Sequence, residues 1–156
     1  GDESFCVILA DDLCDSKEDS VLSQMIKIYN KYQCSIVAIE EIPISQSNKY
    51  GVISGNLIDD SNDIYRVKSM VEKPAPNDSP SNLAIIGRYI LTPNIFEILR
   101  DIKPDSSGEI QITDALNIQA QKGNVIAYKF QGKRFDCGSI EGYVKATNYF
   151  AKKMQI

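Results

Sequence analysis

The sequence predicts an α/β fold in which helices cover both faces of a sheet. Three apolar runs of strand length lead to this prediction: residues 5–10, 34–39 and 83–91. None of them alternates between polar and apolar side chains, which is typical of strands buried on both faces. Between the first two runs, residues 20–32 carry apolar side chains at helical spacing. A strand, a helix and a strand of these lengths predict a βαβ unit with a right-handed crossover.

The other elements follow in chain order. Helices are predicted at 93–99, with Pro93 in the first turn, at 110–121 and at 140–152, where the chain ends in an amphipathic pattern. A further strand is predicted at 125–130. Gly87 lies in the middle of the third apolar run, where a glycine either allows a ligand or another backbone to approach or marks a bulge. With 156 residues, the chain is long enough for one domain, 1–156, with a sizeable core.

Residues 48–74 are predicted to form a hairpin-like insertion. A polar turn at 59–63 separates two strand-like stretches, and the second one ends at Glu72, Lys73 and Pro74. Because neighbouring side chains on a strand point to opposite faces, we expect Glu72 and Lys73 not to pair with each other. Glu72 is suited to accept hydrogen bonds from sugar hydroxyls, and Lys73 to bind a phosphate. The alternative is a solvated pair that closes the strand.

Composition excludes several classes of protein and site. Apolar residues make up 43% and charged residues 24%, as in a soluble globular protein, and the net charge is −4 with scattered Lys and Arg, which argues against nucleic-acid binding. No apolar run approaches the ~20 residues of a membrane span, and no leader is recognisable, so we expect a cytoplasmic protein without membrane contact. The four cysteines are too far apart for a zinc site, and we expect Cys6 and Cys34 to be core thiols. The absence of histidine excludes Ser-His and Cys-His nucleophile pairs.

Carboxylates follow two predicted strands. Asp11 and Asp12 come directly after the first apolar run, and Asp136 follows a strand far along the chain. Ligands of open α/β sheets bind at the carboxyl ends of strands, and Mg²⁺ prefers oxygen ligands and leaves room for phosphates. Asp11 and Asp136 are therefore candidate metal ligands. The alternatives are that Asp12 and Asp15 cap the next helix, which we favour for Asp12, and that Asp136 is a turn residue.

Six short motifs occur in a fixed order. They are L-A-D-D at 9–12, N-K-Y-G at 48–51, V-E-K-P at 71–74, S-N-L-A-I-I-G-R-Y-I-L at 81–91, G-E-I-Q-I-T-D-A at 108–115 and G-K-R-F-D-C-G at 132–138. With these motifs the chain resembles the bacterial UTP–glucose-1-phosphate uridylyltransferases, also called UDP-glucose pyrophosphorylases. The resemblance extends from Phe5 to the last predicted helix. It implies a three-layer α/β/α nucleotide-diphospho-sugar transferase fold, which is Rossmann-like and has a mixed sheet.

The resemblance also implies roles for six residues. Asp11 and Asp136 match metal ligands, Glu72 matches the residue on the glucose hydroxyls, and Lys73 matches the lysine on the sugar phosphate. Gly51 and Gly87 match backbone positions close to the sugar. The implied reaction joins UTP and glucose 1-phosphate into UDP-glucose and pyrophosphate by Mg²⁺-assisted in-line attack. A sugar phosphate is already ionised at neutral pH, so a chain without histidine can take part in this reaction.

The glycine-rich loop that grips the triphosphate in this family does not occur in these residues. We therefore expect a later portion of a larger domain, without the nucleotide-binding portion and without turnover on its own. Two alternatives stay open: a sister pyrophosphorylase that uses dTTP, and a non-catalytic module for sugar-phosphate binding or oligomerisation. The family resemblance also implies a homo-oligomer, a dimer or a tetramer.

Overall fold

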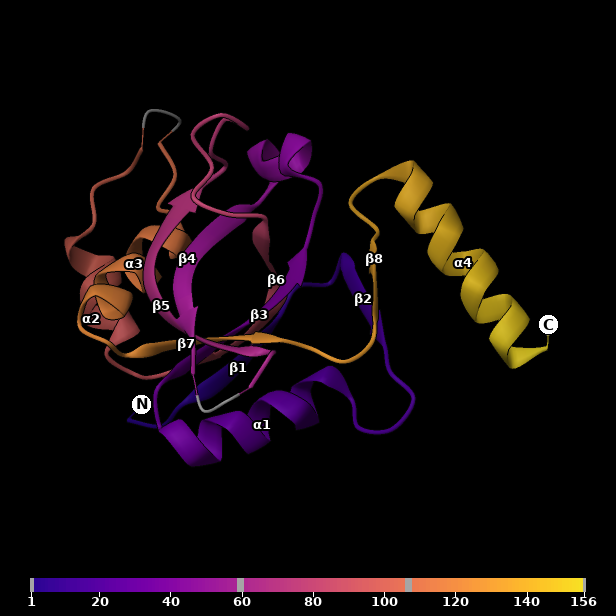
Figure 1. Ribbon diagram of the computed structural model, residues 1–156, viewed down its shortest axis with the longest axis horizontal. Helices are drawn as coiled ribbons and strands as arrows, with labels where there is room; N and C mark the ends of the chain where they lie inside the picture. Colours follow the sequence, from indigo (N-terminus) through magenta and orange to yellow (C-terminus); the bar gives the residue numbers. More distant parts are fainter. Residues whose placement is uncertain (1, 59–60, 106–107, 156) are drawn as a thin grey trace.

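The computed structural model describes residues 2–58, 61–105 and 108–155. Its main sheet has six strands in the order β1-β6-β3-β7-β5-β4 (Figure 1). The bounds of these strands are β1 Phe5–Ile8, β3 Ser35–Glu41, β4 Gly51–Leu57, β5 Ile64–Glu72, β6 Leu83–Leu91 and β7 Val125–Lys129. The sheet is mixed, as predicted, because β3 and β7 pair in parallel whereas the other pairs are antiparallel.

Helices cover both faces of this sheet, which confirms the predicted three layers (Figure 1). Helix α1 (Val21–Tyr32) begins at Ser20, whose side chain accepts a hydrogen bond from the backbone N of Ser23 at 3.1 Å. Its Val21 and Met25 pack on one face of the sheet. Helices α2 (Ile95–Asp101) and α3 (Ile112–Gln121) pack on the other face. Strand β3 contacts both layers because its successive apolar side chains point to opposite faces.

The prediction that the first strand is buried on both faces was wrong. Within the described residues, β1 pairs only with β6, so it lies at an edge of the sheet, and its side chains alternate between half-buried and exposed. Ile8 is 54% exposed, and Cys6, predicted to be a core thiol, is exposed as well. The same prediction for Cys34 is confirmed. The run is a strand as predicted, but the predicted burial on both faces is not observed in this chain.

The hairpin predicted over 48–74 is formed by β4 and β5, which pair antiparallel with Gly51 opposite Glu72. Both strands also continue the main sheet, since β5 pairs with β7 and Val52 of β4 lies opposite Ala84 of β6. A 3₁₀ helix, η1 (Ile44–Lys49), leads from β3 into the hairpin. Part of the predicted polar turn, residues 59 and 60, lies outside the described residues.

A separate two-stranded sheet joins distant parts of the chain. Strand β2 (Asp12–Asp15) pairs antiparallel with β8 (Lys133–Asp136), and Asp12 lies opposite Asp136. Asp12 therefore begins a strand, and the prediction that it caps the next helix was wrong, because Ser20 has that role. The last helix, α4 (Ile140–Met154), follows β8 (Figure 1). It packs on this strand because the rings of Tyr149 and Phe150 contact the ring of Phe135. No helix in the described part of the chain is long and apolar enough to cross a membrane.

Candidate functional site

All six predicted site residues line one cleft of about 980 Å³. They come from distant positions in the sequence and from different elements of the fold. Asp11 lies between β1 and β2, Gly51 begins β4, Glu72 ends β5, Lys73 follows it, Gly87 lies in β6, and Asp136 ends β8. The first turn of α3 and the start of α4 contribute further lining residues, among them Thr113 and Gly142. The fold therefore brings the predicted residues together.

Asp11 and Asp136 face a common space beside Gly138. A Cβ atom added to Gly138 would lie 3.2 Å from Asp11 Oδ2 and 3.2 Å from Asp136 Oδ1. The backbone fixes this arrangement, because Cys137 N donates a hydrogen bond to the carbonyl oxygen of Asp11 at 2.7 Å. Among the described residues, no group of three or more cysteine and carboxylate side chains is placed to hold a metal. A cation here would take two carboxylate oxygens from the protein and its other ligands from water and substrate, as Mg²⁺ does.

A buried cation lies next to these carboxylates, and the sequence did not point to it. The side chain of Arg134 is only 7% exposed, and it pairs with Asp12 through Nε and with Glu40 through Nη1 at 2.5 Å. Its Nη2 lies 3.6 Å from Asp136 Oδ2. Burial alone would lower the pKa of this guanidinium, but the hydrogen bond and charge of Asp12, together with Tyr50 and Glu40, raise it above its ordinary value. Arg134 is therefore permanently charged.

Tyr50 contacts both Arg134 and Asp136. Its hydroxyl donates a hydrogen bond to Asp136 Oδ2 at 2.9 Å, and the guanidinium of Arg134 lies 5.0 Å from the centre of its ring. Burial raises the pKa of Tyr50, Arg134 opposes this, and the hydrogen bond and charge of Asp136 add to it. The hydroxyl therefore stays protonated at neutral pH and acts as a donor. The sequence signal for Tyr50 was its place in the N-K-Y-G motif, from which we assigned a role only to Gly51.

Glu72 is held by a residue of α3. Thr113, buried in the first turn of the helix, donates a hydrogen bond to Glu72 Oε2 at 2.6 Å. Gly51 lies opposite Glu72, and a Cβ atom there would lie 3.0 Å from Thr113 Oγ1 and 3.1 Å from Glu72 Oε2. The absence of a side chain at Gly51 thus leaves room for this pair. The second carboxylate oxygen of Glu72 can still accept hydrogen bonds from a ligand.

Lys73 leaves the strand direction directly after Glu72. Its φ of 46° is in the left-handed region, and its backbone N donates a hydrogen bond to the carbonyl oxygen of Tyr50 at 3.0 Å. The turn brings Lys73 Nζ to 3.7 Å from Glu72 Oε1. The expectation that these two side chains do not pair was therefore wrong, because strand alternation no longer holds once the chain turns at Lys73.

The space beside Gly87 is taken by the protein itself. A Cβ atom on Gly87 would lie 2.6 Å from Leu9 Cβ and 2.7 Å from Asp12 Oδ2. The backbone N of Gly87 donates a hydrogen bond to Asp12 Oδ2 at 2.6 Å, and its carbonyl oxygen accepts one from Leu9 N at 2.9 Å. Both alternatives for this glycine are observed, because Leu9 lies close to it and the pairing of β6 with β3 is also irregular here: Val37 lies opposite Tyr89, whereas Ile39 lies opposite Ile85. This packing places the β1–β2 turn, and Asp11 with it, over β6.

Tyr89, two residues further along β6, adds a polar group to the cleft. Its burial, together with the charges of Glu72 and Asp12, raises the pKa of its hydroxyl to about 12. The hydroxyl is therefore neutral at physiological pH and available as a hydrogen-bond donor.

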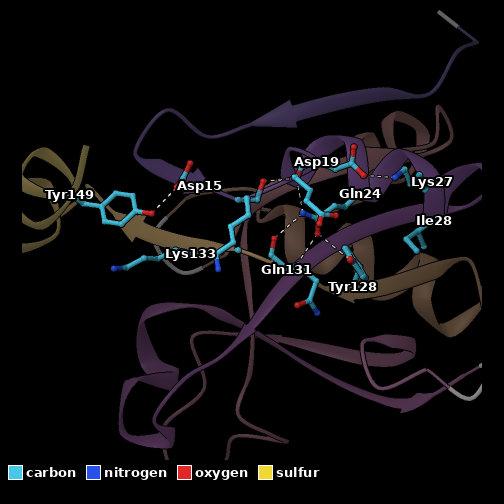
Figure 2. Close-up of a pocket in the computed structure, with 13 residues that line it drawn as sticks. Asp15, Asp19, Gln24, Lys27, Ile28, Tyr128, Gln131, Lys133 and Tyr149 are labelled. Atoms are coloured by element: carbon cyan, nitrogen blue, oxygen red, sulfur yellow. Dashed lines mark hydrogen bonds and ion pairs between the residues drawn. The ribbon is translucent and has the colours of Figure 1, made fainter. Parts of the chain in front are cut away.

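A second hollow, of about 750 Å³, contains none of the predicted site residues. Figure 2 shows Gln24 of α1 at its centre, with hydrogen bonds to the carbonyl oxygens of Asp19 and Gln131, each at 2.8 Å. The side-chain oxygen of Gln24 accepts from Tyr128 and from the backbone N of Gln131. The amide of Gln24 thus ties α1 to the β7–β8 connection. The nitrogen and the oxygen of this amide are both paired within the protein, so we assign Gln24 a structural role.

The mixed three-layer fold and the cleft lined by carboxylates are consistent with a nucleotidyl transferase. The chain belongs to the nucleotidyl transferase family, whose profile matches residues 1–153. Within this family it is similar to the UTP–glucose-1-phosphate uridylyltransferase of Pseudomonas aeruginosa, with 65% identity over 150 residues, 96% of this chain and 53% of that protein.

Solved structures agree with this assignment. A crystal structure of apo UDP-glucose pyrophosphorylase superposes with a TM-score of 0.94 and 59% identity, over 99% of this chain and 56% of that one. The crystal structure of UDP-glucose pyrophosphorylase complexed with UDP-glucose superposes with a TM-score of 0.93 and 59% identity, over 98% of this chain and 58% of that one. The predicted resemblance and fold class are thereby confirmed, and the chain spans about half the length of the curated relatives it matches.

Proposed function

We propose that this chain forms the sugar-phosphate and metal-binding part of a UTP–glucose-1-phosphate uridylyltransferase. Such an enzyme makes UDP-glucose and pyrophosphate from UTP and glucose 1-phosphate. The observation that carries the proposal is that Asp11, Asp136 and the neighbours Glu72 and Lys73 line a single cleft although they come from three distant segments of the sequence. The similarity to UTP–glucose-1-phosphate uridylyltransferases supports the choice of nucleotide and sugar.

In this proposal, one end of the cleft binds the sugar. Glu72, held by Thr113, accepts hydrogen bonds from glucose hydroxyls through its second oxygen. Gly51 and Gly87 also line the cleft: the absence of a side chain leaves room for Glu72 and Thr113 beside Gly51, and for the β1–β2 turn that carries Asp11 beside Gly87. Lys73 then places its ammonium group on the phosphate of the sugar phosphate.

Asp11 and Asp136 would hold Mg²⁺. The shared space beside Gly138, bordered by one oxygen of each carboxylate, fits a small cation with hard oxygen ligands. When bound, the ion would supply neutralisation of the negative charge on the phosphates.

The reaction itself needs no general base from the protein. A phosphate oxygen of glucose 1-phosphate forms a bond to the α-phosphorus of UTP, and the bond to pyrophosphate breaks on the opposite side. The residues of the cleft contribute orientation and charge: Glu72 orients the sugar, and Lys73 reduces the repulsion between the two phosphates. This fits a chain without histidine.

Turnover by the 156-residue chain alone is not expected. The sequence has no glycine-rich loop to grip the triphosphate, so UTP would lack its main phosphate contacts. The measurement is pyrophosphate release from UTP and glucose 1-phosphate by the purified chain. Release that is abolished by Asp136→Asn would contradict this prediction, since it would show that the chain contains a complete site.

The replacement Lys73→Ala should weaken binding of UDP-glucose by about 10- to 100-fold, because a charge-assisted contact to phosphate is worth roughly 1.5–3 kcal/mol. Calorimetric titration of the chain, with and without Mg²⁺, measures this. Lys68→Ala is the matched control, because Lys68 is an exposed lysine on β5, the strand that precedes Lys73, and does not line the cleft.

We expect Lys68→Ala to bind like the unmodified chain. Equal loss in both variants, or no loss in Lys73→Ala, would remove the phosphate role of Lys73. No UDP-glucose binding by a folded chain would favour a non-catalytic module over the proposed function.

The proposal extends to assembly and location. Exposed apolar side chains on α4, such as Ile140 and Tyr143, support self-association as a dimer or a tetramer. All four cysteines are free thiols, which supports a cytoplasmic location.

A further inference from the structure

The two carboxylate oxygens of Asp136 have different surroundings. Oδ2 accepts the hydrogen bond from Tyr50 at 2.9 Å and lies 3.6 Å from Arg134 Nη2. Oδ1 accepts a hydrogen bond from Gly138 N at 3.1 Å and borders the space shared with Asp11. Oδ2 is therefore held by two side chains, whereas Oδ1 is held by a backbone N–H and faces Asp11.

Tyr50 is well placed to impose this orientation. Its backbone N donates to the carbonyl oxygen of Ser47 at 3.2 Å at the end of η1, and the guanidinium of Arg134 lies against its ring. The hydroxyl then reaches Asp136, which is 86 residues further along the chain. Since Arg134 is itself fixed by two carboxylates, the phenol has little freedom to move away from Asp136.

The backbone of Tyr50 has a second contact in the cleft. Its carbonyl oxygen accepts the hydrogen bond from Lys73 N at 3.0 Å. This bond helps hold Lys73 in the left-handed conformation, which a lysine adopts only at a cost in energy. A single residue thus contacts both a candidate metal ligand and the candidate phosphate-binding lysine.

We propose that Tyr50 is a positioning residue that couples the metal end of the cleft to the phosphate end. Its hydroxyl turns Asp136 so that Oδ1 faces Asp11, and its carbonyl oxygen fixes the turn at Lys73. The inference rests on the proposed function, because it assigns Tyr50 a role toward the cation that Asp11 and Asp136 would hold. The sequence similarity and the fold do not by themselves assign such a role to this tyrosine.

The test is to measure the affinity of the chain for Mn²⁺ by electron paramagnetic resonance, in the presence of glucose 1-phosphate. Tyr50→Phe removes only the hydroxyl and keeps the ring against Arg134, so the packing is retained. Because partners that orient metal ligands typically contribute 10- to 100-fold in affinity, we expect Mn²⁺ to bind roughly 10-fold more weakly to this variant. Tyr143→Phe is the matched control, since Tyr143 is 63% exposed on α4 and does not line the cleft. It should bind Mn²⁺ like the unmodified chain.

Asp136→Asn separates the two proposals. If it abolishes Mn²⁺ binding while Tyr50→Phe leaves the affinity unchanged, the metal site stands and the role of Tyr50 is overturned. If the unmodified chain binds no Mn²⁺, or if Asp136→Asn binds it normally, the metal site and the inference both fall. Circular dichroism of each variant distinguishes a local effect from unfolding, and a structural role alone would not change Mn²⁺ affinity in a fully folded Tyr50→Phe protein.

Discussion

The replacement Arg134→Met should lower the free energy of unfolding by about 3–5 kcal/mol, because it leaves the buried carboxylate of Asp12 without its cation. Arg134 is 7% exposed and pairs with Asp12, which is 7% exposed, and with the partly exposed Glu40. Methionine has a similar length but offers no donor. The free energy of unfolding would be measured by urea titration, with circular dichroism monitoring the fraction of folded protein.

Two further variants identify the cause. Arg100→Met, in an exposed position at the end of α2, should change stability by no more than about 0.5 kcal/mol. The double variant Arg134→Met with Asp12→Asn should recover part of the lost free energy of unfolding, because it also removes the negative charge that Arg134 neutralises. A double variant as unstable as the sum of the two single variants would show that the carboxylates are not the source of the loss.

This network also shows where prediction from sequence ended. The contact between Arg134 and Asp12 joins residues 122 positions apart, and it forms only because β2 and β8 pair at the edge of the cleft. No local sequence pattern predicts a contact between residues this far apart in the chain. Asp12 before a helix resembles a capping residue, and the assignment fails because the chain first makes a short strand.

Elements with strong local signals were predicted well. The continuous apolar run at 83–91 is a strand with the same bounds, buried along its whole length, and the helical spacing at 20–32 is α1 with Ser20 as its cap. The first apolar run is a strand too, but the described residues supply it with a partner on one side only, so the burial that its composition predicts is not observed in this chain.

The sequence predicted the candidate residues that would contact ligands, but not the residues that hold them in place. Motif resemblance supplied Asp11, Glu72, Lys73 and Asp136, and the structure brings them to one cleft. The residues that hold them in place, Thr113 for Glu72 and Tyr50 for Asp136, act across 41 and 86 positions of sequence. Such supporting contacts depend on three-dimensional packing, so only a structure reveals them.

The replacement Gly142→Ala should destabilise the protein, although the same change usually stabilises a helix. An alanine in an exposed helix is favoured over glycine by roughly 0.5–1 kcal/mol. At Gly142, in the first turn of α4, a Cβ atom would lie 1.7 Å from the carbonyl oxygen of Asp136 and 2.7 Å from its carbon. Two atoms cannot approach this closely, so the start of α4 has to move away from β8. We expect a net loss of about 2–3 kcal/mol.

The displacement should also reach the cleft. Ser139 connects the two segments, since its Oγ accepts from Gly142 N at 3.1 Å and donates to the carbonyl oxygen of Asp136 at 3.3 Å. Moving the helix therefore moves the backbone of Asp136, and weaker Mn²⁺ binding should accompany the loss of stability. Asn148→Ala, an exposed position of the same helix, is the control and should be neutral or stabilising. A Gly142→Ala protein as stable as the unmodified chain would mean that α4 does not pack against Asp136 in this way, and that Asp136 is not held from this side.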